Sequence, residues 1–380
     1  MRHWSVLVLL LTACGGGDST AAGDVTDRVG DAAAHGLLAT RRLLPDARLC
    51  TRGALACEVP FGSGGGVVTP DGAALVRVVG GRSSVVALVA AGGDSAIAFG
   101  REGAGPGEYR APVEIDRDAA GNVSVYDLFT RRLLRFAPDG RPVANAVTQL
   151  PPAPQPVMRL VDGALLMVAA EDPNAKGDTL PLFVYAVADD GAPQRRHALD
   201  LRLPSYGAGE FVAMGRTFEA LPQFAFGRDG RLVYAAGATA ELALFDSTGR
   251  LAVRGGFRAT GRRVTEADIE AAVAAQIRRL PSMGPMRDQI LERMRHAAER
   301  HPGVTQLVVM ADGEVWAREA PEAGTDSVAW LVYSASLGPQ ARVRMSVDDR
   351  PVGVHAGRVL LARSGEDEQS SGYWWMRAAP

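Results

Sequence analysis

The chain has 380 residues, of which 47% are hydrophobic, and its 41 basic residues nearly balance its 43 acidic residues. This composition indicates a folded core and argues against a nucleic-acid-binding protein, which would carry a marked basic excess. The 44 glycines favour an all-β chain, because many tight turns need residues that tolerate positive φ.

Residues 1–14 are typical of an export signal. The apolar run over residues 4–11 is too short to span a bilayer. The Leu-Thr-Ala-Cys sequence that ends at Cys14 resembles a bacterial lipoprotein cleavage site, which implies that Cys14 becomes a lipid-carrying N-terminus. The alternative is an ordinary signal peptide with an incidental cysteine. Gly15 is not the aspartate that retains such proteins at the inner membrane, so we expect the periplasmic face of the outer membrane.

Residues 15–36 are rich in glycine, alanine and small polar residues. Such a composition predicts a flexible tether between the membrane and a folded domain over residues 37–380. The membrane is therefore an expected partner through the N-terminal lipid anchor.

Cys50 and Cys57 are the remaining cysteines. A two-residue turn at residues 53–54 would place them directly opposite each other in a hairpin, within reach of a disulfide. Export to an oxidising compartment favours that bond. The alternative, two reduced thiols for redox or metal chemistry, lacks a Cys-x-x-Cys spacing. We predict a structural disulfide.

Six turn glycines divide most of the chain into repeats. Each lies between two apolar runs, and five are followed by a second turn glycine, so most units hold four strands. The six are Gly72, Gly121, Gly163, Gly230, Gly313 and Gly357. A four-stranded unit repeated at roughly 40 to 50 residues is typical of a propeller blade. The sequence therefore predicts an all-β, six-bladed β-propeller.

The last unit has room for only three strands. A propeller closes its ring when a segment from the other terminus supplies the missing strand, because closure removes an exposed sheet edge. Residues 37–61 are the natural donor.

The segment at residues 99–109 reads Phe-Gly-Arg-Glu-Gly-Ala-Gly-Pro-Gly-Glu-Tyr. It resembles the Gly-x-Gly-Pro-Gly-Glu-Phe connector of bacterial exported six-bladed propellers of the NHL type, many of them lipoproteins without assigned activity. Tyr109 replaces the phenylalanine and is expected to wedge between adjacent sheets. A phosphate-binding loop is the competing interpretation, but no Lys-Ser/Thr follows. The resemblance implies a propeller and no particular reaction.

The 83 residues between Gly230 and Gly313 leave room for an insertion between blades 4 and 5. Thr265 and Asp268 form a capping box, and apolar residues then recur at helical spacing on either side of a break at residues 281–285, until Pro302 and Gly303 end the second helix. We predict a helical hairpin over residues 261–303. Its arginines could face acidic loops across the mouth of the ring, which indicates a lid; the alternative is a solvated charged helix beside solvated loops.

Acidic residues and one histidine at the ends of predicted strands are the candidate ligands of the channel mouth: Glu114, Asp116, Glu171, Asp172 and His355. No histidines stand at a convincing metal-ligand spacing. A stretch beginning at Asp172 is faintly similar to a calcium loop, but Lys176 occupies a ligand position. No catalytic residue, metal site or cofactor is predicted.

These observations predict a membrane-tethered propeller that acts as a binding or scaffolding module for an unknown protein or small molecule. The alternative is a calcium-dependent lactonase or related hydrolase. Propeller lactonases bind calcium through inward-facing carboxylates and amides, for which Glu114 and Asp116 are candidates.

Overall fold

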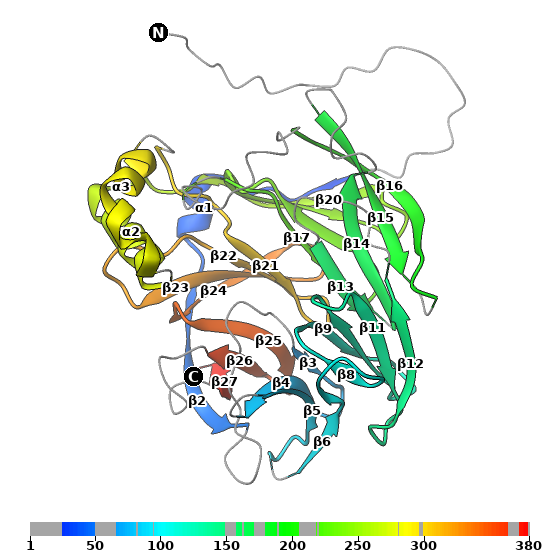
Figure 1. Cartoon of the computed structure of the whole chain (residues 1–380). Coiled ribbons are helices and arrows are strands. Elements are labelled where there is room, and N and C mark those ends of the chain that lie inside the picture. The colour runs from blue at the N-terminus through cyan, green and yellow to red at the C-terminus, as the bar shows by residue number, and fades with distance from the viewer. Residues whose placement is uncertain are drawn as a thin grey trace.

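The computed structural model is mostly β, and its sheets lie side by side around a common centre in a propeller-like arrangement (Figure 1). It describes residues 25–49, 66–80, 83–93, 95–148, 157–161, 163–170, 179–187, 190–204, 218, 220–279, 281–295, 299–363 and 372–378. The predicted lipidation site Cys14, the predicted disulfide of Cys50 and Cys57, and the candidate ligands Glu171 and Asp172 lie outside these residues.

Successive strands pair antiparallel and build the first four sheets in chain order. The first contains β3 (Gly66–Val68), β4 (Ala74–Gly80), β5 (Ser83–Val89) and β6 (Ala96–Phe99). The second contains β9 (Pro112–Arg117), β10 (Val123–Asp127), β11 (Arg132–Phe136) and β12 (Pro142–Val147). The third contains β13 (Val157–Val161), β14 (Ala164–Ala170), β15 (Thr179–Val187) and β16 (Pro193–Pro204). The fourth contains β17 (Gln223–Phe226), β18 (Leu232–Ala235), β19 (Thr239–Phe245) and β20 (Leu251–Thr260).

An eight-stranded sheet takes up the rest of the chain, and the N-terminal strand β2 (Thr40–Arg48) lies in its middle. On one side of β2 are β24 (Pro339–Ser346), β23 (Ser327–Tyr333), β22 (Val315–Arg318) and β21 (Gln306–Val309). On the other side are β27 (Gly372–Ala378), β26 (Arg358–Arg363) and β25 (Asp349–His355). The first residues of β2 pair parallel with β24, and the rest pair antiparallel with β27. The predicted donation of a strand by the N-terminal segment is confirmed.

Burial along the strands explains the sequence pattern. All five residues of β10 are buried, because neighbouring sheets cover both faces of this inner strand. The outermost strand β12 alternates instead between exposed and partly buried residues. Apolar clusters accordingly lie between neighbouring sheets; one of them joins side chains of the first sheet to side chains of the second. The six predicted turn glycines all have positive φ.

Tyr109 lies in that cluster, at the end of the glycine-rich connector. The connector contains the short parallel pair β7 (Arg101–Glu102) and β8 (Glu108–Tyr109). The Tyr109 side chain is fully buried; its hydroxyl donates to the Phe99 carbonyl at 2.8 Å and accepts from the Val86 amide at 2.7 Å. The predicted wedge between adjacent sheets is confirmed.

The second half of the expected tether is folded, which corrects the sequence prediction for residues 25–36. β1 (Thr26–Asp27) pairs parallel with β20, and α1 (Ala32–Gly36) follows it. Asp31 caps α1 by accepting a hydrogen bond from the Ala34 amide at 2.7 Å. Small residues let this segment lie close to β20; for example, a Cβ on Gly30 would come within 2.9 Å of the Phe257 ring.

Between β20 and β21 the chain forms α2 (Glu266–Arg279), the 3₁₀ helix η1 (Pro281–Met286) and α3 (Arg287–Arg295). Asp268 and Thr265 make the reciprocal hydrogen bonds of a capping box, as predicted. The helices bury apolar side chains mainly against each other, together with Phe218. No helix in the described part of the chain has the length and apolar character needed to cross a bilayer.

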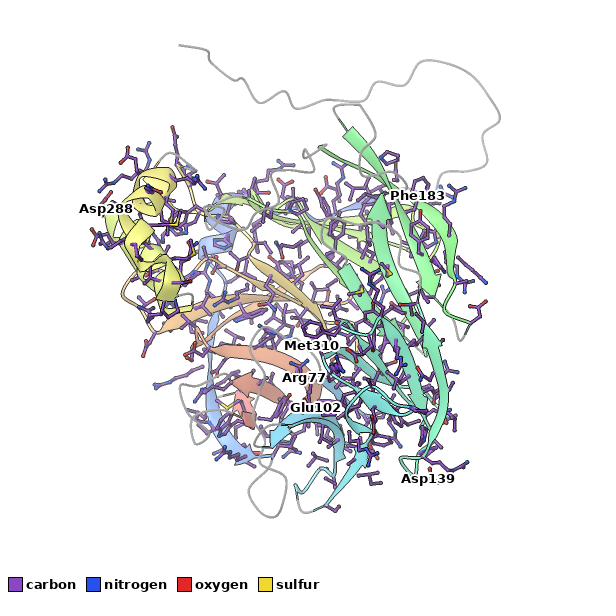
Figure 2. The ribbon with its side chains drawn as sticks, in the orientation of Figure 1. Arg77, Glu102, Asp139, Phe183, Asp288 and Met310 are labelled. Carbon is purple, nitrogen blue, oxygen red and sulfur yellow. The ribbon has the colours of Figure 1, made fainter. Side chains whose placement is uncertain are left out.

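The helices do not lie over the mouth of the ring, so the lid interpretation is corrected. Figure 2 shows Asp288 of α3 at the outer edge of the molecule and Arg77 near its centre. The helices do contact the acidic loop before β23, because Asp268 accepts from the Ala323 amide at 3.2 Å. Among the described residues, Arg295 pairs with Glu266 within the helices and not with an acidic loop.

Candidate functional site

A cavity of about 180 Å³ lies at the centre of the molecule, where edge strands of the five larger sheets meet. We call it the central pocket. Its walls come from β3, β9, β13, β17, β21 and β25, with further contributions from β26 and β27. The polar lining side chains are Glu114, Arg159, Gln306, Arg350 and Tyr373, and the apolar ones include Met158, Phe224, Leu307 and Val352. Residues far apart in sequence therefore converge here because the sheets surround one axis.

Glu114 is the acidic side chain of the central pocket. Burial raises its pKa to about 7, and the nearby carboxylate of Asp116 adds to the rise. The Arg159 guanidinium and the Leu160 backbone act in the opposite direction but do not cancel the effect of burial. At neutral pH, Glu114 therefore exists as a mixture of the ionised carboxylate and the neutral acid, and the neutral acid can donate a hydrogen bond.

The Asp116 carboxylate pairs with an arginine from another sheet of the ring. Arg228, in the turn between β17 and β18, donates through Nη2 to Asp116 Oδ1 at 2.7 Å and to the Arg117 carbonyl at 3.3 Å. The Asp116 side chain is only 2% exposed. Burial raises its pKa, although the Arg228 charge opposes that rise. This carboxylate is already neutralised by the protein's own arginine.

Two arginines of the central pocket form no ion pair with a carboxylate among the described residues. The Nε of Arg159 is buried and has no hydrogen-bond partner in that part of the chain. Burial lowers the pKa of Arg350, an effect that Tyr373 partly offsets. Burial and the Arg350 charge also lower the pKa of the neighbouring Arg318. The pocket therefore has an excess of desolvated positive charge.

The side chains of the central pocket do not fit a calcium ion. Calcium takes roughly six to eight oxygen ligands, usually with several carboxylates. Here Asp116 is held by Arg228, and Glu114 lies beside Arg159. The described residues contain no group of three or more acidic, histidine or cysteine side chains placed to hold a metal.

Of the described residues predicted from sequence, Glu114 lines the central pocket and Asp116 lies two residues further along the same strand. His355 ends β25, where it packs against the turn glycine Gly72, and it is not part of the pocket wall. Sequence reasoning missed Arg159 and Arg350. A signal was present for Arg159, because it is a charged residue inside a short, otherwise apolar strand. Arg350 follows Asp349 in a mixed strand and carries no such signal.

No family model matches the chain, and no curated protein matches it. Among solved structures, it is similar to the calcium-binding protein regucalcin from Agrobacterium tumefaciens, with 12% identity, a TM-score of 0.41, and coverage of 90% of this chain and 95% of that one. It is also similar to a gluconolactonase from Xanthomonas campestris, with 14% identity, a TM-score of 0.41, and coverage of 93% of this chain and 94% of that one. A DUF4221 family member from Bacteroides vulgatus is similar with 10% identity, a TM-score of 0.48, and coverage of 88% of this chain and 97% of that one. Similarities this low assign neither a site nor an activity.

Proposed function

We propose that this protein is a six-bladed propeller that binds a small organic anion in its central pocket. The count of six treats the eight-stranded sheet as two blades, β21–β24 and β25–β27 with β2, joined through β2. The helices α2 and α3 are then an insertion between blades 4 and 5. Lipidation at Cys14, a short tether and the Cys50–Cys57 disulfide complete a binding module held at the periplasmic face of the outer membrane.

The observation that carries the proposal is the pair Arg159 and Arg350, which line one cavity and form no close ion pair with a carboxylate in the described chain. The carboxylate nearest in effect, Glu114 beside Arg159, is partly neutral at pH 7. A desolvated guanidinium is costly until an anion and hydrogen bonds compensate it. A carboxylate ligand between the two arginines would supply both. Glu114 in its neutral form would donate a further hydrogen bond to that ligand.

The size and walls of the pocket define the class of ligand. A cavity of about 180 Å³ is smaller than a typical pocket for a drug-sized molecule. Phe224, Leu307 and Val352 present apolar surface beside the polar side chains. A short-chain carboxylate, with its apolar body against these residues, fits both conditions.

Calorimetric titration with a series of short-chain carboxylates tests the proposal. We expect saturable binding that weakens about tenfold or more in Arg350→Met, because a charge-assisted hydrogen bond is lost. Arg254→Met, which removes an exposed arginine of β20, is the matched control and should bind normally. Equal binding by both variants, or no binding by the parent protein, would refute the central pocket as an anion site.

The proposal also predicts how binding depends on pH. Protonation of Glu114 removes a negative charge from the pocket, so carboxylates should bind more tightly at pH 6 than at pH 8, on either side of its pKa of about 7. This difference should disappear in Glu114→Gln. A calcium-binding site would behave in the opposite way and weaken as the carboxylate is protonated.

A further inference from the structure

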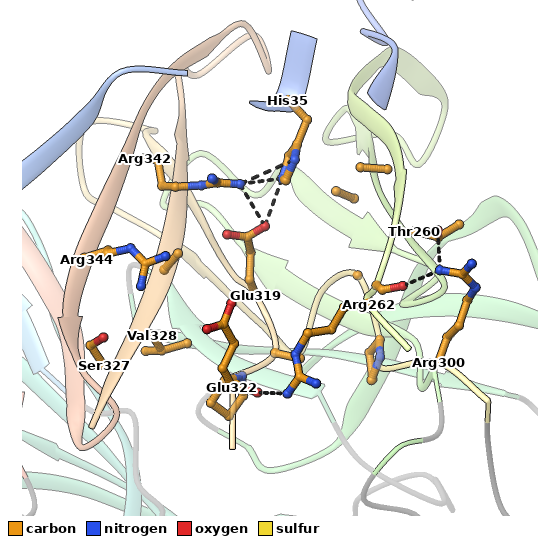
Figure 3. Close-up of a pocket in the computed structure, with 18 residues that line it drawn as sticks. His35, Thr260, Arg262, Arg300, Glu319, Glu322, Ser327, Val328, Arg342 and Arg344 are labelled. Carbon is orange, nitrogen blue, oxygen red and sulfur yellow. Dashed lines mark hydrogen bonds and ion pairs between the residues drawn. The ribbon is translucent and has the colours of Figure 1, made fainter. Parts of the chain in front are cut away.

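A second cavity, of about 300 Å³, lies between the N-terminal helix α1 and the strands β20, β23 and β24 (Figure 3). We call it the outer pocket. It shares no residue with the central pocket, so the two proposals stand or fall separately. Its charged lining residues are His35, Arg262, Arg300, Glu319, Glu322, Arg342 and Arg344.

One wall of the outer pocket is a cluster of three side chains. His35 Nε2 lies 2.9 Å from Glu319 Oε1 and 3.0 Å from Arg342 Nη2. Arg342 Nη2 also donates to the same Glu319 oxygen at 3.3 Å. The Glu319 oxygen is thus shared between a His35 nitrogen and an Arg342 nitrogen.

The remaining arginines differ in what they already bind. Arg262 is already paired, because its terminal nitrogens donate to both oxygens of Asp268 and to the Pro321 carbonyl. Among the described residues, Arg300 donates only to the neutral oxygens of Thr260 and Gly261. Arg344 is exposed and has no hydrogen-bond or ion-pair partner among the described residues. Two guanidiniums are therefore available to an incoming anion.

The outer pocket also offers a hydrogen-bond acceptor and apolar surface. The Glu322 carboxylate makes no hydrogen bond within the described chain, so it can accept from hydroxyl groups. Val328, Ala240 and Ala329 supply apolar surface. We propose that the outer pocket binds a hydroxylated organic anion, such as a sugar carrying a carboxylate or phosphate group: arginines bind the anionic group, and Glu322 binds hydroxyls.

Binding in the outer pocket is coupled to the N-terminal segment, because His35 belongs to it. The pocket is complete only when β1 and α1 lie on β20, where the Gly30 amide donates to the Gly256 carbonyl at 2.9 Å. A ligand that contacts His35 favours this docked arrangement by its own binding free energy. Occupancy would thus hold residues 25–36 against the ring.

The experiment is an NMR titration of the full mature chain that follows the His35 imidazole signals, which are assigned with a His35→Gln variant. The probes are glucuronate, glucose 6-phosphate, inorganic phosphate and neutral glucose. We expect saturable shifts with the two sugar anions, weaker shifts with inorganic phosphate and none with glucose. The preference between carboxylate and phosphate decides which anionic group the site takes.

Variants make the test specific. Arg344→Met is an exposed change that should leave the fold intact and weaken binding about tenfold. The central-pocket variant Arg350→Met is the matched control and should titrate like the parent. Amide hydrogen exchange in residues 32–37 should slow when a sugar anion is bound. Shifts unchanged in Arg344→Met, or absent from the parent protein at millimolar ligand, would overturn the proposal.

Discussion

Replacing Glu114 by glutamine should change how the stability of the protein depends on pH. The pKa of Glu114 is raised from 4.5 to about 7, so between these values the folded state binds more protons than the unfolded state. The free energy of unfolding contributed by this group is therefore greatest below pH 4.5 and is lost as pH rises towards 7. Between pH 5 and pH 8 the loss amounts to roughly 2 to 3 kcal/mol.

Glutamine keeps the shape of the side chain and carries no charge at either pH. The free energy of unfolding of Glu114→Gln should therefore rise, relative to that of the parent, by roughly 2 to 3 kcal/mol between pH 5 and pH 8. The assay is urea unfolding followed by tryptophan fluorescence, at both pH values and in a buffer without carboxylates. Glu270→Gln, which removes an exposed glutamate of α2, is the control and should show no such gain. If the free energy of unfolding of Glu114→Gln changes between pH 5 and pH 8 by the same amount as that of the parent, Glu114 titrates normally and the reasoning is refuted.

Three further changes test contacts elsewhere in the molecule. Arg228→Met should destabilise the fold by about 3 to 5 kcal/mol in urea unfolding, because it removes the cation that donates to the buried Asp116; Arg231→Met, in the same turn, should cost far less. Tyr109→Phe should cost about 1 to 3 kcal/mol in the same assay, because the hydroxyl joins two buried backbone groups; a neutral result would contradict its role as a polar wedge. Asp268→Asn should expose α2 and α3 to limited proteolysis while the strands stay protected, because it breaks the bidentate contact with Arg262; loss of the whole fold would show that the helices support the ring.

Local sequence patterns predicted much of the fold. Turn glycines such as Gly121 and the alternation of the flanking strands indicate hairpins, and hairpins repeated at one period indicate a propeller. The capping box at Thr265 could be read directly because its hydrogen bonds are local. The folded state of residues 25–36 could not, because a low-complexity sequence gives no sign that its glycines allow close contact with β20.

The candidate site was predictable only in part. Glu114 could be found because the hairpin pattern places it on the innermost strand of a blade, next to the central channel. Arg159 and Arg350 are separated by 191 positions, and only the geometry of the ring brings them to one cavity. The partnership of Asp116 with Arg228 has the same origin, since no local rule connects a strand in one sheet with a turn in another.

The position of β2 between β24 and β27 has a consequence for how this protein reaches its native state. An N-terminal strand whose partners lie at residues 339–346 and 372–378 cannot pair until nearly the whole chain has left the ribosome and, if it is exported, the membrane channel. Such long-range pairing makes folding slow, and unpaired sheet edges stay exposed until it is complete. During that interval the chain should depend on holding chaperones. Removal of β27 (Gly372–Ala378) should block maturation.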